Sequence, residues 1–452
     1  MLFELLPLFM FLSMLGLILT GYPIGIALGG TAIIFGIIGI GLDVFDHREF
    51  FIFVPRVWTI AENLQIIAVP LFVFMGVMLE RSRIAQDLLE AFQVLLRRVP
   101  GGMALAVTLM GVVFAAITGV IGASVIMLTL IALPTMLKAG YRPSLAVGTI
   151  AAASTLGILI PPSILLVFLS ELLQISVGYL FAGAIYPGLL LASLYMLYII
   201  GYTFFVPGAA PRLSGPEHKL PTSQFISVLV KGIIPPVILI FIIMGSVLSG
   251  LATITESAAF GAGGACLLAW LRGNLGFAKL RESLQRSAMT VGMVFVLFIG
   301  ATSFAYVFRA LGGDDIVLWL IDAFDYGPWS VLGLVIFLIF LLGFFFDVLE
   351  ILLIAMPIFG PIVAPLEFPG HILTADVIYW FAILVAVTLQ TSFLTPPMGI
   401  ALFYIKGVAQ DSVKMRDIYV GIIPFVALQM ICVGIVMAFP DLVMDLPHRL
   451  LD

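Results

Sequence analysis

The stretch Thr155-Leu-Gly-Ile-Leu-Ile-Pro-Pro-Ser163 interrupts one long apolar segment of the chain, and Thr391-Ser-Phe-Leu-Thr-Pro-Pro-Met398 interrupts another. The two Pro-Pro pairs lie 235 residues apart. Proline has no backbone N–H and clashes with the preceding helical turn, so each pair predicts a broken helix. Inside a bilayer, freed carbonyl groups are tolerated only where protein buries them or a polar cavity solvates them. Paired breaks of this kind in two halves of a chain indicate a transporter's binding site.

Composition places the chain in a lipid bilayer. Of its 452 residues, 62% are hydrophobic and 10% are charged, and the mean hydropathy is +1.25. Soluble domains carry about 25% charged residues, so we expect an all-α polytopic membrane protein with no nucleic-acid partner. The segment Leu2–Thr20 is long enough to span and lacks a basic leader. We therefore expect it to be a retained first helix.

The cysteines and histidines predict neither a metal site nor an enzyme. Cys266 and Cys432 lie within apolar segments, and the four histidines lie in loops without metal-ligand spacing. No nucleophile and base stand at a catalytic spacing. We expect no transition metal and no cofactor, and among intramembrane enzymes only a carboxylate mechanism on Asp347 and Glu350 merits a test.

Ten apolar segments have spanning length. They are Leu2–Thr20, Ile24–Leu42, Leu64–Leu79, Leu145–Leu169, Leu180–Phe205, Val228–Leu248, Ile254–Leu271, Met289–Val307, Val377–Ile405 and Ile418–Phe439. Two further regions, 102–136 and 329–366, are too long for one span and contain small and polar residues midway. We expect each to form a re-entrant hairpin, whereas the alternative is a full span followed by a surface helix.

The basic residues of the loops predict the orientation. Ten spans and two hairpins place 16 of the 20 Lys and Arg residues on one side, and only Arg48, Arg56, Arg309 and Arg449 on the other. By the positive-inside rule the first side is cytoplasmic, so both termini face outward. If either hairpin crossed the membrane, this bias would collapse.

The two halves of the chain correspond in order. Gly29-Gly30 and Gly263-Gly264 lie 234 residues apart, close to the offset of the proline pairs. Five crossings per half is an odd number, so the second half is expected to be inverted. We predict a first repeat over 1–206, a cytoplasmic linker over 207–222 and a second repeat over 223–452. Within the repeats we expect amphipathic arms at 81–99 and 310–326, hairpins at 102–136 and 329–366, and broken helices at 145–169 and 377–405.

Each hairpin tip with its neighbouring break is predicted to form a cation site, because half-helix ends offer free carbonyls and hydroxyls offer neutral oxygen ligands. The first site is predicted from Thr118, Gly119, Gly122, Ser124, Ser154, Thr155, Gly157, Pro161, Pro162 and Ser163. The second is predicted from Gly343, Asp347, Glu350, Thr391, Ser392, Thr395, Pro396 and Pro397. The substrate is expected near the tips, at Thr118, Ser124, Asp347 and Thr395. Alternatively, the Ser, Thr and Gly residues allow close helix packing.

The acidic residues within the apolar segments leave alternatives open. Asp347 and Glu350 could carry protons or bind a cation, or they could be solvated at the outer surface. Glu171 and Glu256 lie at segment ends, and Glu256, which follows Thr255, is expected to cap a helix.

Five motifs together resemble the large membrane subunit of tripartite ATP-independent periplasmic (TRAP) transporters, over essentially the whole chain. They are Ile117-Thr-Gly-Val-Ile-Gly-Ala-Ser-Val, Lys138-Ala-Gly-Tyr-Arg-Pro, Gly157-Ile-Leu-Ile-Pro-Pro-Ser, Thr255-Glu-Ser-Ala-Ala-Phe-Gly-Ala and Leu394-Thr-Pro-Pro-Met-Gly. The resemblance implies a sodium-driven, elevator-type importer in the bacterial inner membrane, whose typical substrates are organic carboxylates such as dicarboxylates, sialic acids, 2-oxo acids and hydroxy acids. The termini that the charge bias places outside would then be periplasmic. The resemblance also implies two partners, a small four-helix membrane subunit and a periplasmic solute-binding protein.

The chain departs from the TRAP pattern at both hairpin tips. Many members of the family have a Ser-rich first tip, and many have an Asp alone at the second tip, where this chain carries Asp347 and Glu350. The alternative function is a stand-alone ion-coupled carboxylate transporter of similar architecture, which would need no binding protein.

Overall fold

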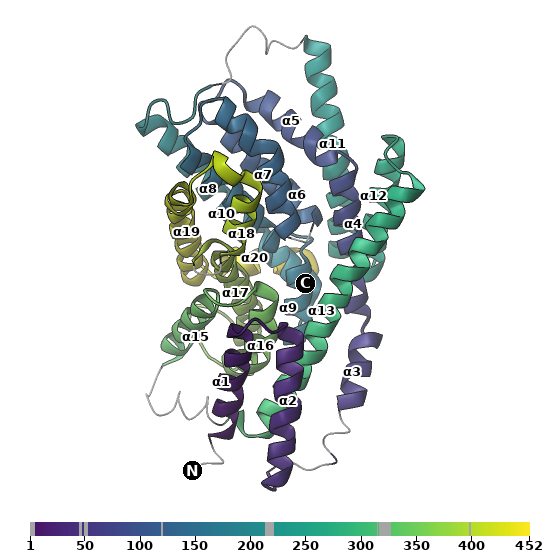
Figure 1. The fold of residues 1–452 in the computed structure, drawn as a ribbon, viewed down its shortest axis with the longest axis vertical. Helices are drawn as coiled ribbons and strands as arrows, with labels where there is room; N and C mark the ends of the chain where they lie inside the picture. The colour runs from purple at the N-terminus through teal and green to yellow at the C-terminus, as the bar shows by residue number, and fades with distance from the viewer. Residues whose placement is uncertain are drawn as a thin grey trace.

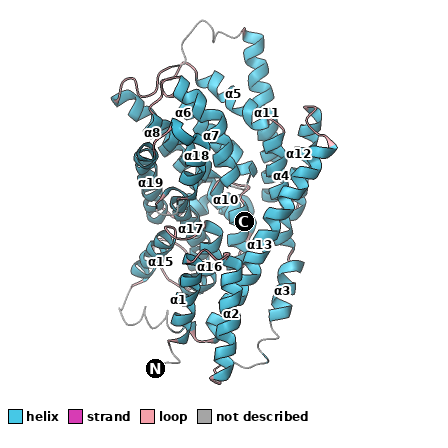
Figure 2. Ribbon diagram, in the orientation of Figure 1, coloured by secondary structure: helices cyan, strands magenta, loops and turns pink. Residues whose placement is uncertain are grey.

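Helices form almost all of the described chain (Figures 1 and 2). A computed structural model describes residues 5–44, 48, 53–118, 121–212, 221–313, 315, 327–396 and 399–452. Within these ranges the only extended pairing is an isolated bridge between Phe368 and Ile372. The predicted all-α class is therefore confirmed.

Seven described helices are long and apolar enough to cross a membrane, and they make the chain a multi-pass membrane protein. They are α2 (Ile24–Gly41), α10 (Val177–Phe205), α11 (Thr222–Leu248), α12 (Ile254–Leu271), α13 (Phe277–Ala310), α17 (Val377–Leu394) and α19 (Met415–Ala438). The ten predicted spans also include the short α1 (Leu6–Leu19), α4 (Leu64–Arg81), and a span divided into α8 (Pro143–Thr155) and α9 (Ile164–Leu173).

Five helices, α2, α4, α11, α12 and α13, form a scaffold layer along the right of Figure 1. Within it α12 packs on α4, and α13 packs on α2 and α4. Glycine permits the closest of these approaches, because a Cβ atom at Gly300 would lie 2.2 Å from the carbonyl oxygen of Gly25. Helix α11 buries only 22% of its apolar window, so most of that window faces lipid or another subunit.

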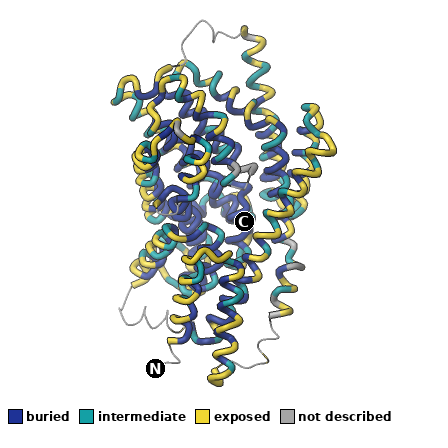
Figure 3. Tube along the Cα trace, in the orientation of Figure 1, coloured by how far each residue is buried: buried dark blue, intermediate teal, exposed yellow. Residues whose placement is uncertain are grey.

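The remaining long helices form a central body to the left of the scaffold layer (Figure 1). It consists of α6 (Gly102–Thr118), α7 (Ile121–Lys138), α8, α9, α10, α15 (Pro328–Leu342), α16 (Val348–Val363), α17, α18 (Ile400–Ala409), α19 and α20 (Asp441–Leu451). Its middle is built from α8 and α17: the apolar window of α17 is 89% buried, and α8 is buried from Leu145 to Thr155 (Figure 3). The two broken segments therefore occupy the core of the body.

One of the two predicted amphipathic arms is described. The segment 81–99 contains α5 (Ile84–Leu96), which meets α4 at 64° and buries Ile84, Leu88 and Phe92. It packs on α11 and α6, and the Asp87 carboxylate pairs with Arg272 of the scaffold layer. The second arm, 310–326, lies largely outside the described residues.

Both predicted hairpin regions contain two helices in contact, α6 with α7 and α15 with α16. The base of the first pair is held by Tyr141, whose hydroxyl oxygen accepts a hydrogen bond from the Met103 N–H at 3.1 Å. Burial raises the pKa of Tyr141, which keeps this hydroxyl protonated. The division into inverted repeats and the path of the hairpins in the membrane remain predictions.

Three local features refine the sequence analysis. A short helix α3 (Phe53–Glu62) and the amphipathic α20 were not predicted. The α11 helix begins at Thr222, the last residue of the predicted linker, of which 213–220 lie outside the described residues. Glu256 caps α12 as expected, but its partner is Thr253, whose N–H donates to Glu256 Oε2 at 2.8 Å, and not Thr255.

Candidate functional site

Both Pro-Pro sequences interrupt helices as predicted. At the first break α8 runs into a short 3₁₀ turn, η2 (Leu156–Ile158), and α9 starts only at Ile164. At the second break α17 ends at Leu394 and α18 starts at Ile400. Pro397 lies outside the described residues, whereas Pro396 is exposed. Each break separates a helix C-terminus from the next helix N-terminus.

The hydroxyls of the first break bond to nearby carbonyl groups. Ser163 Oγ donates to the Ile158 carbonyl at 2.6 Å, so it partners a group that the break frees. Ser154 Oγ and Thr155 Oγ1 donate to carbonyls of α8, at 2.7 Å and 2.9 Å. Their lone pairs remain as neutral acceptors. Gly157, Pro161 and Pro162 are all buried beside them.

The second break repeats this arrangement on α17. Thr391 Oγ1 donates to the Thr388 carbonyl at 2.6 Å, and Thr395 Oγ1 donates to the Thr391 carbonyl at 2.8 Å. Ser392 differs, since its buried hydroxyl has no hydrogen-bond partner in the described part of the chain. It is therefore the one predicted ligand of this break whose hydroxyl is not engaged by the protein.

The two hairpin tips face different helices. A Cβ atom at Gly343, at the end of α15, would lie 2.2 Å from Ser392 Oγ, so the second tip lies against the second break. A Cβ atom at Gly122, near the start of α7, would lie 2.9 Å from Tyr404 of α18. Ser124 is buried two residues further along α7, while Gly119 and the side chain of Thr118 lie outside the described residues.

Asp347 and Glu350 form the start of α16. Asp347 is its N-cap residue, and the Asp347 N–H donates to Glu350 Oε2 at 2.8 Å in a capping box. Glu350 is buried, at 8% exposure, and Asp347 is partly buried. The structure gives Glu350 a capping role, and its place in the second cation site remains a prediction.

Residues from both tips and both breaks line one space, which we call the central cavity. Its volume is about 220 Å³, and it lies between the central body and helices α4 and α13 of the scaffold layer. Among the predicted site residues, it is lined by Gly122, Gly157, Ser163 and Asp347. Val69, Val73, Met293 and Val294 supply its scaffold wall. Helices separated by more than two hundred residues in sequence thus contribute to a single site.

The other described members of the predicted set do not line the central cavity. They are Ser124, Ser154, Thr155, Pro161, Pro162, Gly343, Glu350, Thr391, Ser392, Thr395 and Pro396. Four of them, Ser154, Thr155, Thr391 and Thr395, donate their hydroxyls to carbonyl groups of their own helix. The sequence therefore located the breaks correctly but did not distinguish the lining from its support.

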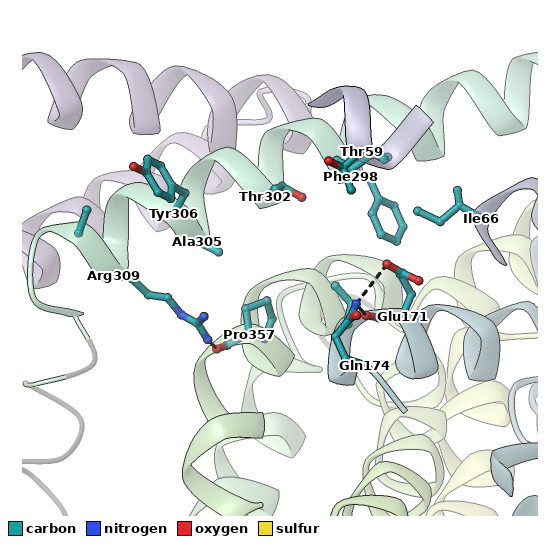
Figure 4. Close-up of a pocket in the computed structure, with 13 residues that line it drawn as sticks. Thr59, Ile66, Glu171, Gln174, Phe298, Thr302, Ala305, Tyr306, Arg309 and Pro357 are labelled. Carbon is teal, nitrogen blue, oxygen red and sulfur yellow. Dashed lines mark hydrogen bonds between the residues drawn. The ribbon is translucent and has the colours of Figure 1, made fainter. Parts of the chain in front are cut away.

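A second space, which we call the side cavity, opens along the seam, the boundary between the central body and the scaffold layer (Figure 4). It has a volume of about 730 Å³ and lies among α3, α4, α9, α13 and α16. Figure 4 shows Arg309 of α13 extended toward Pro357 of α16, and its guanidinium donates to the Pro357 carbonyl. On the opposite wall Gln174 Nε2 donates to Glu171 Oε1 at 3.3 Å. The side cavity is thus polar, with a cation and an anion on separate walls.

An aromatic pair lies where the two cavities approach each other. Phe168 of α9 lines the central cavity, and Phe298 of α13 lines the side cavity. Their ring centroids are 4.9 Å apart. Along α13 the residues at 290–294 line the central cavity and those at 298–310 line the side cavity. The pair therefore closes the seam between the two spaces.

Sequence reasoning missed polar residues in the core and along the seam. Gln390, Gln429 and Tyr195 are completely buried within the central body. The two glutamines carried a usable signal, because each is an isolated amide within an apolar segment. Tyr404 and Arg309 carried no comparable signal, since their neighbours in the fold come from distant helices.

The comparisons with known proteins agree with this architecture. The family model described as "Tripartite ATP-independent periplasmic transporter, DctM component" matches residues 11–442. The YdaH transporter of Alcanivorax borkumensis, known from a crystal structure, superposes with a TM-score of 0.59 over 87% of this chain and 89% of that one. The identity is 12%, so this likeness concerns the fold alone.

Curated relatives extend over nearly the whole chain. A C4-dicarboxylate TRAP transporter large permease from Pseudomonas aeruginosa is 28% identical, over 87% of this chain and 89% of its own length. A sialic acid TRAP transporter large permease from Vibrio cholerae is 27% identical over 97% of both chains. An ectoine TRAP transporter large permease from Halomonas elongata is 25% identical over 96% of this chain and 97% of its own. These relatives are named as permeases and not as enzymes. Because the family model spans almost the whole chain, this chain belongs to the DctM family, the large permease subunits of TRAP transporters.

Proposed function

We propose that the chain is the sodium-coupled permease through which an organic carboxylate, delivered by a periplasmic binding protein, enters a bacterial cell across the inner membrane. The observation that carries this proposal is the central cavity, where both hairpin regions and both helix breaks contribute to one wall. A largely apolar cavity with a few polar side chains such as Ser163 and Asp347, placed at paired broken helices, suits a solute that must leave water to cross the membrane.

The helix ends at the central cavity favour an anion. Ser163 lies directly before α9 and Asp347 directly before α16, so two helix N-termini reach this space. Free amides and the partial positive charge of a helix N-terminus attract a carboxylate. The names of several relatives mention carboxylates, namely C4-dicarboxylate and sialic acid. An organic carboxylate is therefore the solute class that we propose here.

The Asp347 carboxylate supports coupling to a cation. It lines the same cavity, and two negative charges in a poorly solvated space repel each other strongly. A sodium ion between Asp347 and the solute would remove that repulsion, so the solute binds well only when the ion is present. Hydroxyl and carbonyl oxygens at both breaks are ligands that suit such a hard cation. We propose sodium on these grounds.

The seam between the scaffold layer and the central body supports an elevator movement. The central cavity lies on this seam, with Met293 and Val294 of the scaffold on one side and Ser163 of the body on the other. If the central body slid against α4 and α13, it would carry the cavity along the membrane normal. The wall of the cavity that the central body supplies would stay intact during this movement. Large apolar side chains on the far face of the scaffold, such as Phe241 and Trp270, are 72% and 62% exposed and would be covered by lipid and the small membrane subunit.

Reconstitution in proteoliposomes tests this function. The permease, its small membrane subunit and the loaded binding protein should together accumulate the acid under an inward sodium gradient, and potassium should not replace sodium. Accumulation by the permease alone, with neither partner, would instead show the stand-alone transporter. Accumulation driven by a proton gradient without sodium would contradict the sodium coupling.

A further inference from the structure

Four uncharged polar side chains meet in the core of the central body. They are Thr155 of α8, Tyr195 of α10, Gln390 of α17 and Gln429 of α19, and each is 0% exposed. The surrounding packing is apolar, since Phe425 lies edge-on to Tyr195 with ring centroids 5.2 Å apart. Polar groups in such a place are normally paired with hydrogen-bond partners.

The hydrogen bonds within this cluster are long. Gln429 Nε2 donates to Thr155 Oγ1 at 3.4 Å, and Thr155 Oγ1 lies 3.4 Å from Gln390 Oε1. The Thr155 proton has a shorter alternative, the Ala152 carbonyl at 2.9 Å. Well-formed hydrogen bonds of these types are about 2.7–3.2 Å long. The polar groups of the cluster are therefore near one another but do not close into short hydrogen bonds.

Three polar atoms of the cluster have no hydrogen-bond partner in the described part of the chain. They are Tyr195 Oη, Gln390 Nε2 and Gln429 Oε1. The Tyr195 hydroxyl lies near Gln429 and Thr155, yet no hydrogen bond of good geometry joins it to a described residue. One hydroxyl, one amide donor and one amide acceptor are thus left over at the same place, which is a complementary set.

We propose that one water molecule binds here and bridges Tyr195, Gln390 and Gln429. A water molecule offers two donors and two acceptors, and a buried water typically makes about three hydrogen bonds to groups that would otherwise lack partners. It can accept from Gln390 Nε2, donate to Gln429 Oε1 and pair with the Tyr195 hydroxyl in either direction. It would serve equally well if the Gln390 amide were rotated by half a turn.

A cation suits this cluster less well than water does. None of the four side chains is a carboxylate, and burying an ion without a counter-charge is costly. The Gln390 N–H group would also face the ion, and turning it away would leave only neutral oxygens around it. The chemistry of the cluster therefore favours a neutral ligand that can both donate and accept.

The position of the water site gives it a structural role. Thr155 and Gln390 are 235 residues apart, the same offset that separates Pro161 from Pro396. Equivalent residues of two repeats can meet only near the axis that relates them, so the site lies where the predicted axis passes between the breaks. The bridging water ties α17 to α10 and α19 beside the first break, whether or not the chain couples transport to sodium.

Density at high resolution tests the site directly. The purified full-length chain should be imaged once in sodium chloride and once in potassium chloride. We expect a single peak within hydrogen-bond distance of Tyr195 Oη and both glutamine amides, equally strong in the two salts. A peak that is present only in sodium chloride would overturn the proposal in favour of a cation. Direct hydrogen bonds among the side chains of the cluster, with no peak between them, would exclude a bound ligand altogether.

A double-mutant cycle provides a second test, read out as the thermal unfolding midpoint and therefore independent of transport. Tyr195→Phe and Gln390→Leu remove two groups that share no direct hydrogen bond. If one water joins them, either substitution releases it, so the double variant should lose clearly less than the sum of the two single losses. Additive losses would contradict the bridge.

Thr388→Val provides the matched control for this cycle. Thr388 is fully buried on the same helix as Gln390, and its hydroxyl donates to the Leu384 carbonyl of its own helix, at 2.8 Å. Combined with Tyr195→Phe, it should give additive losses. If the losses of this control pair deviate from additivity as much as those of the test pair, substitutions in this core are coupled in general. The bridging water would then not be the cause of the coupling.

Discussion

Phe168 of α9 and Phe298 of α13 lie ring against ring, with centroids 4.9 Å apart and planes inclined at 47°. One ring belongs to the central body and the other to the scaffold layer. Each lines a different cavity, so this contact separates the central cavity from the larger side cavity. Any movement of the central body against α13 must slide one ring past the other.

Phe168→Ala should therefore connect the two cavities. We expect a cysteine at Ser163, on the central cavity, to react faster with a small hydrophilic thiol reagent when Phe168 is alanine. The measurement is the labelling rate of the cysteine variant with and without the second substitution. Phe181→Ala removes an equally buried ring from α10, away from the seam, and should leave the rate unchanged. Equal rates in all three proteins would show that the pair does not seal the central cavity.

How far the sequence predicts the site depends on how local each feature is. The Pro-Pro breaks were predictable, because a missing N–H and a ring clash act on the helix that contains them. The approach of Gly122 to Tyr404 was not, because it depends on how two helices from different halves pack. The same reason hid the contact of Thr155 with Gln390, although the offset of 235 residues was visible. Function at the level of the family followed from the motifs, whereas the lining of the cavity required the fold.

Gly343→Ala should destabilise the protein, whereas Gly333→Ala should not. Both lie in the second hairpin region, and a Cβ atom at Gly343 would come within 2.2 Å of Ser392 Oγ, while one at Gly333 would meet no atom within 4 Å. Overpacking of this kind typically costs about 1–3 kcal/mol. An exposed glycine in a helix gains up to about 1 kcal/mol on becoming alanine. Unfolding midpoints measure both, and a stabilised Gly343→Ala would contradict the close contact of tip and break.

Glu350→Gln separates helix capping from ion binding. The amide oxygen of glutamine can still accept the Asp347 N–H, so the cap and the unfolding midpoint should be largely kept. Glu350→Ala removes the acceptor and should cost about 0.5–2 kcal/mol, the usual value for a lost N-terminal cap. If Glu350 acts only through the cap, sodium-dependent uptake by the Gln variant will resemble that of the parent protein. A large rise in the sodium requirement of the Gln variant would make Glu350 a ligand.

The orientation can be tested with single cysteines in loops. The excess of basic residues on one side predicts that cysteines at Lys138 and Lys279 are labelled only from the cytoplasm. A cysteine at Asp315, and one at His47 outside the described residues, should be labelled only from the periplasm. Impermeant maleimide applied to intact cells and to inverted vesicles measures both. Labelling of the Lys138 position from the periplasm would contradict the predicted first hairpin and the orientation built on it.

The proposed sodium coupling can be tested by removing the hydroxyls of Ser124 and Thr395. Both hydroxyls are buried at the proposed cation sites, Ser124 beside the first tip and Thr395 at the second break. Removing one oxygen ligand should weaken ion binding by about 1–3 kcal/mol, which is roughly 5- to 150-fold in affinity. Ser124→Ala and Thr395→Val should therefore each raise the sodium concentration needed for half-maximal uptake.

The control for these two variants is Thr108→Val. Thr108 is equally buried, but its hydroxyl bonds to the Ala104 carbonyl within α6, in the first hairpin and about three turns before the tip. Its sodium dependence should match that of the parent protein. Solute capture by the isolated binding protein must remain the same in all assays, because that protein is not altered. If Ser124→Ala and Thr395→Val lower the maximal rate without changing the sodium dependence, these hydroxyls support helix packing and do not bind the ion.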